Sequence, residues 1–309
     1  MFSVRKEEFT NPRCLWWFLF LLAISLVLGA RTLLTLCSLA WTTDAYTHIL
    51  LILPISAAVI CLEWPSKGLQ VEPSWRAGSI LLVVALLLAA FLKWESTALG
   101  TDEQLSISTL ALVLWWLGSF IASFGTRLAK SFLFPLCFLF WMVPLPTSVL
   151  DTIIAWLQQG SAYAAQILFT VVGVPVTQDG VRVTIPGLTV EVAQECSSIR
   201  SSMILLVTTM VLAQLFLRSP WRKTFVIGIA IPLSVAKNGL RIFTIAMLGT
   251  RVDPAFLTGK LHHNGGVIFL SLALAVIFLL LWALRDPKSA QSEGNLRPAI
   301  SSANQSDGG

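Results

Sequence analysis

A cysteine stands among polar residues at the point where an apolar run begins. The segment 195–200 reads ECSSIR and leads into the apolar stretch 200–217. A thiol at the start of a helix lies near unpaired backbone N–H groups and the positive end of the helix dipole, and Arg200 adds a guanidinium one turn on. Both features favour the nucleophilic thiolate of Cys196. The alternative is that Ser197 or Ser198 caps the helix while Cys196 only packs.

A second reactive segment lies inside the apolar run 225–248. Lys237 and Arg241 are four residues apart and therefore share one face of a helix, with Asn238 and Gly239 beside them. A charge at membrane depth costs several kcal/mol unless it is paired or faces a cavity. This depth favours a functional role for Arg241. The alternative is that both cations reach the interface or bind lipid head groups.

Two of the three histidines are adjacent, at the entrance to the last apolar run. His262 and His263 precede Asn264, Gly265 and Gly266. Imidazole titrates near neutral pH and can exchange protons with a leaving group, and glycine permits close backbone approach. Adjacent helical residues point in different directions, so one active-site histidine is expected rather than two. A metal site is the weaker interpretation, because no third and fourth ligands stand at usable spacing.

The three segments together supply a thiol nucleophile, a fixed cation and a general acid/base. These are the minimum requirements for acyl transfer through a thioester. Such a mechanism requires no cofactor. The other cysteines show no paired or metal-ligand spacing; they are Cys14, Cys37, Cys61 and Cys137.

The elements that position these segments are expected to be transmembrane helices. Charged residues make up 12% of the 309 residues and hydrophobic residues 56%, which predicts an all-α integral membrane protein with about eight spans. The expected spans are 14–30, 46–63, 77–93, 105–124, 131–149, 200–217, 225–248 and 265–284. The net charge of +5 lies in short loops and indicates topology, not a nucleic-acid partner.

Basic residues follow the even-numbered spans, which places both chain ends in the cytoplasm by the positive-inside rule. The expected organisation is a cytoplasmic N-terminal segment, 1–13, a polytopic membrane domain, 14–284, and a disordered cytoplasmic tail, 285–309. The basic loop residues that carry this argument are Lys67, Arg76, Arg127, Lys130, Arg218, Arg222, Lys223, Arg285 and Lys288.

The segment 151–198 lies between the fifth and sixth spans and is expected on the extracytoplasmic side. Its first part, 153–172, is apolar but broken by polar residues and glycine, which suits a helix at the interface or a shallow re-entrant segment. Alternating apolar residues over 181–185 and 188–192, with turns at Asp179-Gly180 and Pro186-Gly187, predict a short β meander. This meander leads directly to Cys196.

These motifs resemble the exosortase/archaeosortase family of membrane transpeptidases. The likeness rests on the segments 195–200, 238–242 and 262–266. It extends upstream to Tyr46-Thr47-His48, Pro144-Leu145-Pro146 and Gly173-Val174-Pro175-Val176. One departure is visible, because the family usually has Ser-Gly after the cysteine and this chain has Ser197-Ser198. We leave His48 outside the catalytic set, since capping or interfacial hydrogen bonding explains it.

The resemblance implies a catalytic triad of Cys196, Arg241 and His262, with Arg200, Asn238 and His263 as supporting residues. His262 is preferred because Gly-Gly follows it at the third and fourth positions, as in the family. The implied activity is that of a thiol protease and transpeptidase of the inner membrane, acting in polysaccharide-linked surface sorting. The implied partners are secreted proteins with a C-terminal Pro-Glu-Pro-type signal, membrane lipid and an acceptor molecule that the sequence does not identify.

Two other classes of protein remain possible from the sequence. In a transporter of an anionic solute or lipid-linked sugar, Lys237, Arg241 and the histidines would bind an anion instead of catalysing a reaction. A transporter commonly shows internal repeats, and the two halves of this chain show no convincing repeat. In a non-catalytic envelope assembly protein, Cys196 would be dispensable.

Overall fold

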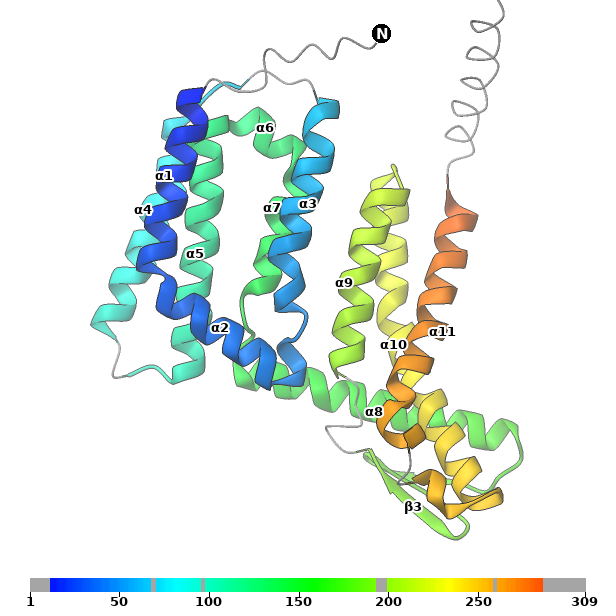
Figure 1. Ribbon diagram of the computed structural model, residues 1–309. Coiled ribbons are helices and arrows are strands. Elements are labelled where there is room, and N and C mark those ends of the chain that lie inside the picture. The colour runs from blue at the N-terminus through cyan, green and yellow to red at the C-terminus, as the bar shows by residue number, and fades with distance from the viewer. Residues whose placement is uncertain (1–11, 68–70, 96–97, 193–198, 258–259, 286–309) are drawn as a thin grey trace, which may run out of the picture. The chain divides into compact units, whose positions relative to one another are not determined.

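The computed structural model describes residues 12–67, 71–95, 98–192, 199–257 and 260–285 (Figure 1). The chain forms two compact units, Met1–Ile153 and Ile154–Gly309. Helix α8, Thr147–Val171, begins in the first unit and continues in the second. The two units are described separately below.

The first unit is helical. Its elements are α1 Pro12–Leu28, α2 Ala30–Thr42, η1 Asp44–Tyr46, α3 Ile49–Lys67, α4 Trp75–Trp94, α5 Thr101–Phe124, α6 Thr126–Ser131, α7 Leu133–Phe138 and η2 Leu139–Met142. Helix α5 has the most buried residues of this unit's helices and packs against α4 and α1. Small residues bring α4 close to α5, since a Cβ on Gly78 would lie 2.6 Å from the Cβ of Ala122.

Two of the expected spans, 14–30 and 131–149, lie within bent pairs of helices. Helices α1 and α2 meet at 70°, and the segment Leu133–Met142 meets α8 at 97°. The expected spans 14–30 and 46–63 left residues 31–45 as a connection. This was wrong for residues 31–42, because the helix that begins at Ala30 continues to Thr42. A single span over 131–149 was also wrong. Pro144 and Pro146 lack the N–H that a helix interior needs, and the chain is not helical between Met142 and Thr147.

Six helices are long and apolar enough to cross a membrane, or up to eight if each bent pair is one span, among the residues described. The expected number of about eight falls in this range. The chain is thus predominantly helical, as the sequence predicted, with one small sheet.

The second unit contains that sheet and three long helices. Its further elements are β1 Thr177–Asp179, β2 Arg182–Ile185, β3 Leu188–Glu191, α9 Ile199–Phe216, α10 Pro220–Arg251, η4 Pro254–Leu257 and α11 Lys260–Leu284. Figure 1 shows α9, α10 and α11 alongside one another, with α8 and the sheet at the end where α9 and α11 begin. Apolar residues of all three helices form one core, centred on Leu205, Val226 and Ile277.

The sheet is an antiparallel meander in the order β1-β2-β3. Two-residue turns join its strands, because Asp179 pairs with Arg182 and Ile185 pairs with Leu188. Gly180 and Gly187 have φ of 59° and 84°, values that favour glycine. The predicted meander is therefore present, with a first strand at Thr177–Asp179 that the alternation did not predict.

Candidate active site

Helix α10 carries four polar residues on one face. They are Ser234, Lys237, Asn238 and Arg241. The last three follow Ser234 by three, four and seven residues. Residues at these spacings lie along one face of a helix. Ser234, Lys237 and Asn238 are buried, and Arg241 is half-buried. We call these four residues the polar stripe of α10.

The first turn of α9 is hydrogen-bonded to the polar stripe. Lys237 Nζ donates to Ser201 Oγ at 2.5 Å, and Ser234 Oγ donates to Ser202 Oγ at 2.5 Å. Near the other end of the same helix pair, Lys223 Nζ donates to Gln214 Oε1 at 2.7 Å. These bonds fix the register of two antiparallel helices, so that the start of α9 lies level with the polar stripe.

Gly239 allows α10 to approach α8 closely. A Cβ at this position would lie 2.5 Å from the Cβ of Ala164 and 3.0 Å from the backbone nitrogen of Ala165. Such distances are too short for an ordinary side chain, so glycine is required while the two helices keep this spacing. Helix α8 therefore contacts the residue between Asn238 and Arg241 and helps to position the polar stripe.

The sheet packs on α8 and α10 beside the polar stripe. Phe169 of α8, Val183 and Val192 of the sheet region, and Ile242 and Ala246 of α10 are buried in one apolar cluster. Ile242 directly follows Arg241 in the chain. The sheet thus gives one end of the stripe a rigid apolar support.

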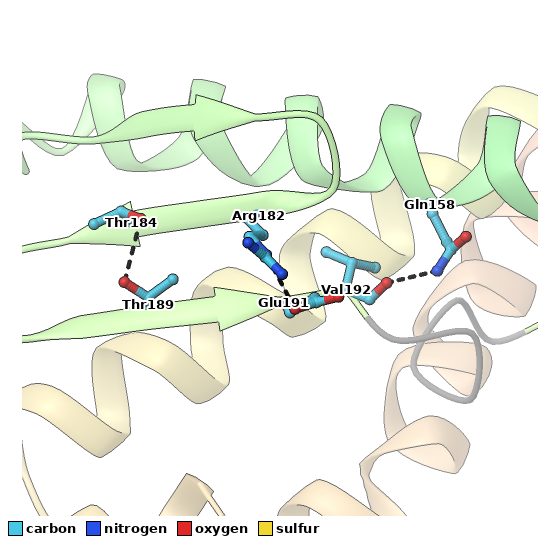
Figure 2. A network of polar contacts seen from close by, with 6 residues as sticks. All are labelled: Gln158, Arg182, Thr184, Thr189, Glu191 and Val192. Carbon is cyan, nitrogen blue, oxygen red and sulfur yellow. Dashed lines mark hydrogen bonds and ion pairs between the residues drawn. The ribbon is translucent and has the colours of Figure 1, made fainter.

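The chain leaves the sheet at a fixed point. Gln158 Nε2 of α8 donates to the carbonyl oxygen of Val192 at 2.7 Å (Figure 2). Val192 N in turn donates to Val181 O at 3.0 Å. Figure 2 also shows two cross-strand contacts, Arg182 to Glu191 at 3.1 Å and Thr184 to Thr189 at 3.2 Å. Val192 is 1% exposed, which agrees with a fixed position.

Cys196 itself lies outside the described residues, as do Glu195, Ser197 and Ser198. The flanking residues Val192 and Ile199 are both described and both buried. In the sequence, Cys196 precedes Ile199, the first residue of α9, by three residues.

The other predicted site residues lie in the second unit as well. Arg200 is exposed in the first turn of α9, and Asn238 and Arg241 belong to the polar stripe. His262 and His263 lie in the first turn of α11, and their side chains are outside the described residues. Helix α11 contacts both α9 and α10. The helices that carry the predicted site residues other than Cys196 are therefore neighbours.

Some residues of this site were not predicted. Ser201 and Ser202 gave no signal in the sequence, because serine is common near helix starts and its partner depends on how α9 and α10 pack. Gln158 was noticed only as a break in an apolar run, whereas in the structure it holds Val192. The one available signal was that polar residues interrupt the apolar run at this point, and it did not identify Val192 as the partner.

Two upstream segments of the family likeness meet in the first unit. Tyr46 Oη donates to Leu145 O at 3.0 Å, and Ser106 Oγ donates to Pro144 O at 2.8 Å. His48 is 6% exposed, and its Nδ1 lies 3.1 Å from Ala45 O. These contacts are a structural reason for the polar residues at these positions.

A cavity of about 650 Å³ opens between α8 and α10. Gly160, Ala164, Val235 and Ala236 line it, with Gln159 among the polar residues. Arg200, Asn238 and Arg241, the predicted site residues with described side chains, do not line this cavity. Within the described residues, no group of three or more His, Cys, Asp and Glu side chains could hold a metal ion.

The model of the transmembrane exosortase family (Exosortase_EpsH) matches residues 41–279. This range is more than half of the chain and includes every predicted site residue, so the protein belongs to the transmembrane exosortase family. Together with its apolar helices, this membership makes it a multi-pass membrane protein. No curated protein matches the chain, and no solved structure does.

Proposed function

We propose that this protein is a membrane-embedded cysteine transpeptidase that cleaves C-terminal sorting signals from secreted proteins through a thioester at Cys196. The supporting observation is the register of α9 and α10. Ser202 pairs with Ser234 and Ser201 with Lys237. Both bonds are made by the first turn of α9, and Ser201 follows Cys196 by five residues in the sequence. On α10, Lys237 lies one helical turn before Arg241.

In the proposed reaction, the thiolate of Cys196 attacks the scissile carbonyl carbon and forms a tetrahedral intermediate. Arg241 stabilises the oxyanion or keeps the thiol ionised, since both roles need a guanidinium at the same place. The C–N bond then breaks, and His262 protonates the leaving amine. A nucleophile of the acceptor attacks the thioester, passes its proton to His262, and releases Cys196 as thiolate.

The family and the charge pattern support the choice of substrate and compartment. Basic loops favour a cytoplasmic location for both termini, which places the start of α9 on the extracytoplasmic face of the inner membrane. A substrate with a Pro-Glu-Pro-type motif, an apolar helix and a basic end would present its motif at this face. The products would be surface proteins of a polysaccharide-linked sorting system.

The test is processing of a co-expressed secreted protein that carries a Pro-Glu-Pro-type signal. The natural chain is compared with Cys196→Ala and Cys196→Ser at equal membrane abundance, and with Cys61→Ser as a matched control. Cys61 lies on α3 in the first unit. We expect the natural chain and Cys61→Ser to shorten the substrate and both Cys196 variants to leave it at full length.

Two results would contradict the proposal. If both Cys196 variants process the substrate like the natural chain, the thioester mechanism is wrong. If no chain processes any secreted protein with such a signal, the transporter and the non-catalytic assembly protein become the better explanations of the buried cations.

A further inference from the structure

Lys237 is a buried cation without a carboxylate partner among the described residues. Its side chain is 6% exposed, and its ammonium donates to the neutral hydroxyl of Ser201. The ion pairs recorded elsewhere, Arg127–Glu72 and Arg182–Glu191, lie at exposed positions. A buried ammonium is unfavourable unless an opposite charge or a polar cavity compensates it.

Asn238 is beside it and is buried without hydrogen-bond partners in the described part of the chain. The side chain is 1% exposed, and both Nδ2 and Oδ1 lack a partner. Nearly all buried side-chain polar atoms in proteins have a partner, so an exception calls for an explanation. Asn238 needs one acceptor for its N–H group and one donor for its carbonyl oxygen.

These two requirements define the chemistry of a missing ligand. An anionic oxygen would compensate Lys237 and accept from Asn238 Nδ2, and an N–H group would donate to Asn238 Oδ1. A peptide with an acidic side chain offers both, through its carboxylate and its backbone amide. The phosphodiester of a lipid is anionic but is not itself a hydrogen-bond donor, so a lipid would reach Asn238 Oδ1 only through another group of its head.

We infer that Lys237 and Asn238 form a specificity site that binds the carboxylate of the acidic residue in the substrate's sorting motif. This inference rests on the proposed function and adds the recognition of one substrate side chain to it. The site lies on the polar stripe, one helical turn from Arg241. When the acidic residue of the motif is bound there, the peptide bonds on either side of it lie close to the start of α9. This helix directly follows the segment with Cys196 in the sequence.

Glu195 is the competing source of a carboxylate, because it belongs to the same chain and lies next to Cys196 in the sequence. Its placement is outside the described residues. The experiment therefore has to distinguish the substrate's carboxylate from that of Glu195 as well as from lipid phosphate.

The test is a double-mutant cycle between enzyme and substrate, measured as the initial rate of substrate shortening in membranes. The enzyme is natural or Lys237→Met, and the acidic residue of the motif is Glu or Gln. We expect Glu to Gln in the substrate and Lys237→Met in the enzyme each to lower the rate by about tenfold or more. Combined, they should lower it no further, because both remove the same interaction.

Three variants make the result specific. Lys237→Arg keeps the charge and should retain the preference for Glu over Gln. Lys223→Met removes an ammonium that also bonds a neutral α9 side chain, Gln214, and should leave the preference unchanged. Glu195→Gln should likewise leave the preference unchanged. Membrane abundance of each variant shows whether it folds.

The inference is overturned if Lys237→Met slows the Glu and Gln substrates by the same factor, since lysine would then act on structure or on lipid. It is also overturned if Lys237→Met couples to Glu195→Gln instead of to the substrate change. Loss of processing in Cys196→Ala is measured in the same series. If processing of the natural pair does not depend on Cys196, the proposed function fails, whatever the result of the cycle.

Discussion

Ser234 of α10 and Ser202 of α9 share a hydrogen bond of 2.5 Å between their hydroxyl oxygens, and both side chains are buried. Together with the bond from Lys237 to Ser201, it sets the register of α9, which follows the cysteine segment in the sequence, against α10, which carries Arg241. In lipid, polar contacts between helices take over part of the role that apolar burial has in water. This register is therefore the feature on which the candidate site depends.

Removing either hydroxyl should lower the stability of the purified protein in detergent. We expect Ser234→Ala and Ser202→Ala each to reduce the free energy of unfolding by about 0.5–1.5 kcal/mol. The double variant should lose little more than the worse single variant, because the two changes remove one bond. Ser161→Ala is the control, since Ser161 bonds only Leu157 O within its own helix. Additive losses for Ser234 and Ser202 would show that the bond contributes nothing.

Gly239→Ala should disrupt the contact between α8 and α10. The new methyl group would meet Ala164 and the backbone of Ala165, and we expect a loss of about 1–3 kcal/mol in unfolding measurements. Gly228→Ala on the same helix is the matched control. A Cβ there meets nothing within 4 Å, so the better helix propensity of alanine should leave stability unchanged or slightly raised. Equal losses at both glycines would contradict the close approach of α8.

Gln158→Met should loosen the attachment of Val192 without opening a cavity. The loss of the bond to Val192 O should slow substrate shortening by about tenfold, because small displacements of a reacting group have large effects on rate. Gln159→Met is the control, since Gln159 is exposed and lines the cavity between α8 and α10. The anchoring role is refuted if Gln158→Met and Gln159→Met keep the natural rate.

Replacement of the two histidines should separate their roles. We expect His262→Ala to abolish substrate shortening and His263→Ala to retain most of it, because neighbouring positions on α11 point in different directions. The measurement is the initial rate of processing at equal membrane abundance. A complete loss in His263→Ala with activity in His262→Ala would reverse the assignment.

The sequence was sufficient to predict the main elements of this fold. Long apolar runs predicted the helices α3, α4, α5, α9, α10 and α11, because a helix that crosses a membrane needs about 20 predominantly apolar residues. The period of two over residues 181–192, with glycines at the turns, predicted the meander. Two errors remained. Pro144 and Pro146 interrupt the helix expected over 131–149, and residues 31–42, which contain no proline, are helical where a connection was expected.

The partners of the site residues could not be predicted in the same way. The spacing of Lys237 and Arg241 indicated a shared face, but not that Ser201 would accept a hydrogen bond from Lys237. That contact depends on the register of α9 and α10, which arises from the packing of small and branched side chains over both helices. Likewise, the residues next to Asn238 in the sequence do not indicate that its buried side chain lacks hydrogen-bond partners in the described part of the structure.

The turns at Gly180 and Gly187 offer a practical route to studying this protein. Nothing approaches a Cβ at either position within 4 Å, and both turns join short strands outside the long helices. A short epitope tag or a fluorophore-binding peptide inserted at Gly180 would lie in the turn between β1 and β2, outside the pairing of β2 with β3 and the bond from Gln158 to Val192. The protein could then be purified, imaged or cross-linked from a handle that is close to its candidate site yet separate from its membrane-spanning helices.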